Sequence, residues 1–254
     1  MSPEIHQTKD GSSTLYSSQF DQFYHNPNGA ASESLYVFFE TSGLNRYLKS
    51  AESLTILEIG FGTGLNFLLL LDLVKTYNLS IPIKFYSIEA FPIDPQVAEE
   101  INFSDHLKNP ELNILLPEIF SELKSGINLI KPFDNLPIEL HLFVGNFEDF
   151  TPENLYTDFI FHDPFSPDVN PELWTSEVFE KLYHWSSSEA MLTTYCAASK
   201  ARGAMCAAGW HVAKTRGALG KREMTIASSS KEKLSDFKSV NEKLLAERYR
   251  NNDF

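Results

Sequence analysis

The hydrophobic positions of this chain fall into short apolar runs that alternate with longer runs of helical spacing. The short runs are rich in branched and aromatic residues, as buried strands are. They cover residues 54–59, 83–88, 140–144, 157–162, 191–195, 211–215 and 224–227. Segments long enough for a helix separate most of them, above all 65–75, 171–185 and 199–208. The alternation predicts an α/β fold, a doubly wound sheet of seven mostly parallel strands with helices on both faces.

Before the first strand, residues 1–50 are expected to form an aromatic-rich extension that packs on the core. Residues 1–13 are polar and are expected to be disordered, whereas 31–48 has helical spacing. The aromatic side chains of the extension, such as Phe20 and Tyr24, allow two interpretations. They either complete the core or line a pocket for a base.

The rest of the chain divides into a domain and a tail. Residues 51–230 hold the α/β domain, within which 94–130 is expected to be mostly helical. Residues 231–254 are expected to form a charged C-terminal tail, helical to about Arg248. We see neither an internal repeat nor a Pro/Ser-rich linker, so we expect one domain with extensions.

A glycine loop follows the first strand and opens the first helix. Gly60, Gly62 and Gly64 fall at every second position, and an acid, Glu58, precedes them by two. In a doubly wound sheet this turn is where a ligand approaches the carboxyl ends of the strands. A dinucleotide fingerprint requires a glycine at Leu65, and no Gly-Lys-Ser/Thr of a triphosphate loop is present.

Acid-x-Gly-x-Gly-x-Gly resembles the first motif of class I S-adenosylmethionine-dependent methyltransferases, which have a Rossmann-like fold. The resemblance implies S-adenosyl-L-methionine as cofactor, with Glu58 and the three glycines beside it. A plain glycine-rich turn and a divergent NAD site are the alternatives. Glu89 ends the second strand, and its carboxylate has the acceptors that two ribose hydroxyls need. By the same resemblance, Asn146 meets the adenine amino group and Phe147 stacks on the ring.

Composition narrows the class of protein. With 254 residues and 43% hydrophobic content, the chain is long enough for one large domain. It has neither an apolar run of membrane-spanning length nor a signal-peptide core, so we expect a cytoplasmic protein without membrane contact. Two cysteines are too few for a disulfide framework or a zinc cluster, and we expect no metal.

The formal net charge of −13 argues against non-specific nucleic-acid binding by the whole surface. The segment 190–230 is nevertheless basic, with Glu223 as its one acid. Its basic residues are Lys200, Arg202, Lys214, Arg216, Lys221 and Arg222. They either steer a polyanion to one face or are ordinary solvated charges.

Five ordered stretches resemble the methyltransferase half of the MnmC enzymes of tRNA wobble-uridine modification. They are Phe20-Asp21-Gln22-Phe23-Tyr24 with Tyr36-Val37-Phe38, Glu58 to Phe67, Ser87 to Pro92, Asp163 to Pro167 with Asn170 to Thr175, and Gly217 to Met224. The chain departs from the family at Pro164, where glycine is usual, and at Asn146, where an acid is usual.

The resemblance implies methylation of the 5-aminomethyl group of the tRNA wobble (2-thio)uridine to 5-methylaminomethyl. In longer family members an FAD-dependent domain first removes a carboxymethyl group. We see no second fingerprint here, and we expect a form without the FAD oxidoreductase domain, with a separate oxidase as a candidate partner on the same nucleoside. The other partner implied is tRNA, at its anticodon stem-loop.

Asp163 ends the fourth strand, where the ligand site of the sheet must be. A primary amine has a pKa near 10 by analogy with lysine, and only its neutral form is nucleophilic. We therefore expect Asp163 to align the amine and to stabilise the ammonium that develops. We expect Lys221 and Arg222 to meet phosphates, helped by Lys200 and Arg202. Two alternatives remain: a methyltransferase for a small-molecule amine or a protein, and an inert S-adenosylmethionine-binding module.

Overall fold

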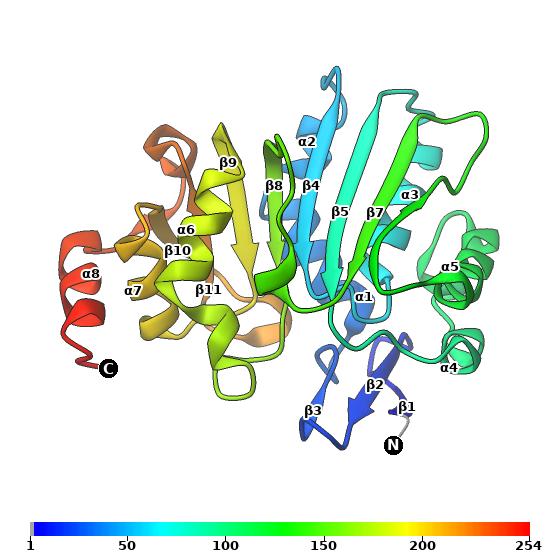
Figure 1. The fold of residues 1–254 in the computed structure, drawn as a ribbon, viewed down its shortest axis with the longest axis horizontal. Coiled ribbons are helices and arrows are strands. Elements are labelled where there is room, and N and C mark those ends of the chain that lie inside the picture. Colours follow the sequence, from blue (N-terminus) through cyan, green and yellow to red (C-terminus); the bar gives the residue numbers. More distant parts are fainter. Residues whose placement is uncertain (1–2) are drawn as a thin grey trace.

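The structure is a computed structural model that describes residues 3–254, and its centre is a nine-stranded sheet (Figure 1). The strand order is β12-β10-β11-β9-β8-β4-β5-β7-β6. The strands are β4 (Leu54–Ile59), β5 (Ile83–Glu89), β6 (Gly126–Ile130), β7 (Ile138–Val144), β8 (Thr157–His162), β9 (Ser186–Thr194), β10 (His211–Thr215), β11 (Met224–Ser228) and β12 (Lys238–Ser239). Strands β9, β8, β4, β5 and β7 are mutually parallel, so their carboxyl ends meet at one edge.

Helices cover both faces of this sheet (Figure 1). They are α1 (Ala30–Ser34), α2 (Leu44–Tyr47), α3 (Leu65–Thr76), α4 (Pro95–Glu100), α5 (Leu115–Glu122), α6 (Ser176–His184), α7 (Ser199–Ala207) and α8 (Glu242–Arg250). Alternate residues of each strand enter opposite cores. Phe159 and Phe161 of β8 join a core with α3 and α5, whereas Ile160 joins one with α6 and α7. The predicted fold class is confirmed.

Two edge strands exceed the seven that the sequence predicts. Strand β6 pairs antiparallel with β7, within the stretch expected to be helical. Its apolar Ile127 and Leu129 are exposed whereas Asn128 between them is partly buried, so the segment lacks the inward apolar alternation that predicts a strand. Strand β12 pairs with β10 and breaks the tail expected to be one helix into a 3-10 turn at Lys231–Leu234 and α8.

The expectation of disorder over residues 1–13 is wrong for the described part, 3–13, while residues 1–2 lie outside it. Strands β1 (Glu4–Gln7), β2 (Ser13–Ser17) and β3 (Gln22–Phe23) form a small antiparallel sheet. Ser12 anchors this sheet because its Oγ accepts the backbone N–H groups of Ala30 and Ala31 at the start of α1. The small sheet lies beyond the carboxyl ends of the central strands (Figure 1).

Two predicted helices are divided in the structure. The segment 31–48 consists of α1, a π-helical turn at Leu35–Glu40, and α2. The segment 171–185 consists of a 3-10 turn at Pro171–Trp174 followed by α6. Thr175 caps α6, because its side chain accepts the N–H of Val178. Among residues 3–254, no helix has both the length and the apolarity to cross a membrane.

Candidate active site

A cavity of about 810 Å³ opens at the carboxyl ends of β4, β5, β7, β8 and β9. Its walls come from the glycine loop, from the residues that follow these strands, and from the N-terminal extension. The predicted residues that line it are Gly60, Gly62, Glu89, Asn146, Phe147, Asp163 and Lys221. The sheet edge expected to hold the ligand site therefore holds a cavity of small-molecule size.

The backbone of Gly60 allows the end of β8 to approach the glycine loop closely. Gly60 has φ +93°, and a Cβ there would lie 2.8 Å from the carbonyl oxygen of Asp163. The N–H of Asp163 in turn donates to Ile59 O at 3.0 Å. The loop thus places the carboxyl group of Asp163 against the cavity.

Glu89 fixes the other side of the glycine loop. Its Oε2 accepts the N–H of Gly62 at 2.8 Å, and its Oε1 accepts the N–H of Phe91 at 2.8 Å. Burial raises the pKa of Glu89, and these backbone donors oppose the rise. A carboxylate oxygen has a second acceptor site, so Glu89 retains acceptor capacity toward the cavity.

Glu58 and Gly64 do not line the cavity, so direct cofactor contact, which we predicted for both, is not supported by the geometry. Gly64 instead begins α3, with φ +78°, and a Cβ there would meet Leu116 at 2.7 Å. Glu58 is buried behind the loop, where it accepts from Ser87 Oγ at 2.7 Å and Asn66 Nδ2 at 2.9 Å. Burial raises the pKa of Glu58 to about 8.

Asn66 connects this buried acid to Asp163. Its Nδ2 donates to Asp163 Oδ2 at 3.3 Å as well as to Glu58. Burial raises the pKa of Asp163 well above its usual range, and the charges of Glu58 and Glu33 raise it further. The Asn66 hydrogen bond and the Lys221 charge act in the opposite direction. Asp163 is therefore a stronger base than an ordinary aspartate.

The two residues expected at the adenine lie together after β7. Asn146 is exposed and lines the cavity. Phe147 also lines it, but its ring packs against Trp185 at a centroid distance of 5.8 Å, and Lys181 Nζ lies 5.6 Å from its centroid. The ring is 7% exposed, so Phe147 belongs to the wall of the site and to the core behind it.

The N-terminal extension closes one side of the cavity with aromatic rings. Phe20 packs against Phe91 and Phe165, at centroid distances of 5.5 and 4.9 Å. Tyr24 lies against Phe165 at 5.2 Å and against the backbone of Gly62, whose Cβ would lie 3.4 Å from its Cδ1. Of the two interpretations of these aromatics, lining a pocket describes Phe20 and Tyr24.

Sequence reasoning missed several polar residues of the cavity, and Gln22, Glu33 and Tyr195 are among them. Gln22 Oε1 accepts from Ser166 Oγ at 2.9 Å, which ties the extension to the loop after β8. Tyr195 Oη donates to Pro164 O at 2.8 Å. The sequence held only indirect signals: Gln22 lies within the aromatic stretch Phe20 to Tyr24, Glu33 lies in the predicted helix 31–48, and Tyr195 ends the predicted strand 191–195.

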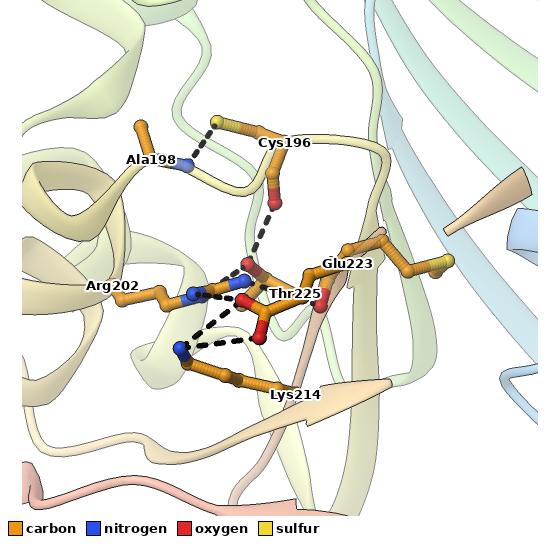
Figure 2. A network of polar contacts seen from close by, with 7 residues as sticks. Cys196, Ala198, Arg202, Lys214, Glu223 and Thr225 are labelled. Carbon is orange, nitrogen blue, oxygen red and sulfur yellow. Dashed lines mark hydrogen bonds and ion pairs between the residues drawn. The ribbon is translucent and has the colours of Figure 1, made fainter. Parts of the chain in front are cut away.

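The predicted basic residues lie in different environments. Arg202 is 2% exposed, and it donates to Thr225 Oγ1 at 2.9 Å and pairs with Glu223 at 3.1 Å. Figure 2 shows Arg202 and Lys214 converging on Glu223. The predicted phosphate contact of Arg202 is therefore wrong, since this arginine is buried in a network that supports the start of β11. Lys200, Lys221 and Arg222 are exposed.

Comparison with known proteins gives the same chemistry as the cavity. Residues 110–230 match a family described as S-adenosyl-L-methionine-dependent methyltransferase. The chain is similar to two proteins called tRNA 5-methylaminomethyl-2-thiouridine biosynthesis bifunctional protein MnmC. The Campylobacter hominis protein is 33% identical over 214 residues, or 84% of this chain and 31% of that protein. One from Leptospira interrogans is 32% identical over 222 residues, or 85% of this chain and 34% of that protein.

Among solved structures, MnmC2 from Aquifex aeolicus has the same fold. It superposes with a TM-score of 0.77 at 24% identity, covering 98% of this chain and 76% of that one. The chain spans about a third of the length of the curated MnmC proteins that it matches.

Proposed function

This chain is an S-adenosyl-L-methionine-dependent methyltransferase similar to the methyltransferase part of MnmC, and from that premise we propose that it methylates an aminomethyl nitrogen in tRNA. The substrate group we propose is the 5-aminomethyl of a wobble (2-thio)uridine, and the product is 5-methylaminomethyl-uridine. The observation that carries the proposal is Asp163, a carboxyl group of raised pKa held against the glycine loop inside the cavity.

The residues of the cavity fit the cofactor. Gly60 and Gly62 leave the backbone bare on one wall, where a Cβ would meet neighbouring atoms. We propose that Glu89 accepts the ribose hydroxyls and that Asn146 and Phe147 meet the adenine. Glu58 acts indirectly, because it orients Asn66 and hence Asp163.

The reaction needs a neutral amine beside an electrophilic carbon. When bound, S-adenosyl-L-methionine supplies a methyl group whose bond to sulfur breaks, with its electron pair going to sulfur, as the amine nitrogen bonds to that carbon. Asp163 holds the amine in line with that carbon and accepts the proton that the nitrogen loses. The pKa of an ordinary aspartate lies far below that of an alkyl ammonium, so proton transfer to it is unfavourable. The raised pKa of Asp163 makes this difference in pKa smaller.

Recognition of tRNA is proposed from three exposed basic residues, of which Lys221 lines the cavity. Arg222 and Lys221 lie in the loop before β11, Lys200 lies at the start of α7, and all three are exposed. We propose that they contact anticodon-stem phosphates, which would position the wobble base without reading sequence. From the proposed tRNA substrate we infer a cytoplasmic enzyme. We further propose that a separate oxidase acting on the same nucleoside supplies the aminomethyl group.

The test is a methyl-transfer assay on defined tRNA. The purified protein is incubated with S-adenosyl-L-methionine and tRNA that carries 5-aminomethyl-2-thiouridine, and the digested nucleosides are analysed by mass spectrometry. We expect conversion to the methylaminomethyl nucleoside, and none with tRNA that lacks the aminomethyl group. Cofactor binding without this product, or methylation of a free alkylamine or protein at a higher kcat/KM, would overturn the proposal.

A further inference from the structure

The ammonium group of Lys221 lies in the cavity, on the side that Glu33 and Tyr195 line. Lys221 Nζ donates to Glu33 Oε1 at 2.8 Å and lies 5.2 Å from the centroid of the Tyr195 ring. All three residues line the cavity, although they come from the loop before β11, from α1 and from the end of β9. A carboxylate and the face of a tyrosine are two groups that attract an ammonium ion.

Glu33 does not depend on Lys221 for its position. Its Oε2 accepts the N–H of Asn26 at 3.2 Å, and its Oε1 accepts Asn26 Nδ2 at 3.1 Å. The side chain of Glu33 is only 11% exposed, whereas that of Lys221 is 41% exposed. The acid is therefore a fixed part of the wall, and the lysine is the more mobile member of the pair.

The location is next to the reacting groups. Tyr195 Oη bonds Pro164 O, directly after Asp163. Glu33 is close enough to raise the pKa of Asp163, and Lys221 is close enough to lower it. A cation bound between Glu33 and Tyr195 thus lies in the electrostatic field of the proposed base.

We propose that Glu33 and the Tyr195 ring form the binding site for the ammonium form of the substrate, and that Lys221 fills this site until the substrate arrives. The proposal rests on the proposed function. A lysine side chain ends in a primary alkyl ammonium, the same group as the aminomethyl substituent of the base. The substrate ammonium would replace it with the same contacts, and its proton would pass to Asp163 only afterwards.

Displacement of Lys221 by the substrate ammonium has two consequences, which are selectivity for a charged substituent and release of the lysine. A neutral substituent such as hydroxymethyl makes no charged contact with Glu33, so it displaces Lys221 poorly. The displaced lysine lies on an exposed loop beside Arg222 and becomes free to contact a phosphate. Binding of the correct substituent would thereby free Lys221 for contact with tRNA.

Binding of free nucleosides tests the exchange without phosphates. The protein is saturated with S-adenosylhomocysteine and titrated with 5-aminomethyluridine or 5-hydroxymethyluridine by NMR. For Glu33→Gln we expect affinity for the aminomethyl nucleoside to fall by about tenfold or more, with hydroxymethyl affinity nearly unchanged. For Lys221→Met we expect the aminomethyl nucleoside to bind about threefold tighter or better, because the internal competitor is gone.

Lys214→Met is the matched control. It breaks a comparable ion pair, with Glu223 at 3.1 Å, outside the cavity, and is expected to change neither affinity. Melting temperatures of all variants report whether the fold is kept. Equal weakening in Glu33→Gln and Lys221→Met would mean that the pair is only structural and would overturn the inference, as would a wild type that binds both nucleosides equally.

The experiments distinguish failure of the ammonium site from failure of the proposed function. Retained preference for the aminomethyl nucleoside with no methyl transfer to tRNA would leave the ammonium site standing and remove the tRNA assignment. Normal methyl transfer by Glu33→Gln, with an unchanged KM for aminomethyl tRNA, would do the reverse.

Discussion

Gly60 and Asp163 are in contact through their backbones, so closely that a Cβ on Gly60 would lie 2.8 Å from the carbonyl oxygen of Asp163. The contact joins the first turn of the sheet to the end of β8, two segments about a hundred residues apart in sequence. It makes the position of the proposed base depend on the absence of a side chain in the glycine loop.

Gly60→Ala is therefore expected to impair catalysis more than folding. The methyl group must push Asp163 away, and a displacement of about 1 Å is enough to cost about a hundredfold in rate. Single-turnover methyl transfer on aminomethyl tRNA measures this loss. Gly209→Ala is the matched control, because Gly209 has a similar φ of +96° but nothing within 4 Å of its Cβ position. An equal loss of rate in both variants would show that backbone strain, not contact with Asp163, is responsible.

Asp163→Asn is expected to separate cofactor binding from methyl transfer. The amide keeps the shape and can still accept from Asn66, but it cannot take a proton. Calorimetry should show S-adenosyl-L-methionine affinity within a few-fold of the wild type, while the single-turnover rate falls by about a hundredfold or more. Asp168→Asn, on an exposed residue outside the cavity wall, should leave both unchanged. A near-normal rate in Asp163→Asn would remove Asp163 as the base.

Glu58 should make the stability of the protein depend on pH. Its pKa rises from an ordinary 4.5 to about 8 on folding, so between these values the folded state binds more protons than the unfolded state. Stability must then fall as pH rises through this range. Because Glu58→Gln removes the effect, its melting temperature relative to wild type should be higher at pH 8 than at pH 5, by about 3 °C or more. The exposed Glu52→Gln should show no such difference between the two pH values, and a pH-independent difference for Glu58→Gln would contradict the assignment.

The sequence pattern predicted the two innermost strands well because β4 and β8 are buried on both faces. Strands β4 and β8 begin and end at the predicted residues. Edge strand β6 exposes apolar Ile127 and Leu129 while polar Asn128 is partly buried, which is the reverse of the pattern that indicates a half-buried strand. The carboxyl ends of the central strands followed from topology alone, so Glu89 and Asp163 could be assigned to the site from the sequence.

The part of the site that the N-terminal extension forms could not be predicted in this way. The contact between Gln22 and Ser166 spans 144 positions, and that between Glu33 and Lys221 spans 188. Such pairs depend on how the N-terminal extension packs on the sheet edge, which no local pattern encodes. The prediction for Arg202 failed for a different reason. Because it lies in a basic segment, Arg202 was expected at the surface, but its side chain is buried and bonds Thr225 and Glu223 at the start of β11.

Two exposed basic residues, Lys200 and Arg222, should contribute to tRNA binding through salt-dependent contacts. Lys200 and Arg222 are exposed, and neither side chain lines the cavity, so their substitution should leave cofactor binding intact. For Lys200→Ala/Arg222→Ala we expect weaker tRNA binding and a shallower plot of log K against log salt. Its slope should be lower by about one for each phosphate that the variant no longer neutralises. Electrophoretic or fluorescence titrations between low and physiological salt measure both quantities.

The control for this prediction must remove a positive charge far from Lys200 and Arg222. Lys84→Ala does so, because Lys84 is exposed at the start of β5, at the end of that strand opposite the cavity. General attraction between tRNA and any positive charge would lower the slope by the same amount for each charge removed in both variants, and this acidic protein makes such attraction weak. A smaller slope per charge in Lys200→Ala/Arg222→Ala alone would therefore show that these two residues contact phosphates. An unchanged slope would contradict the proposed phosphate contacts of Lys200 and Arg222.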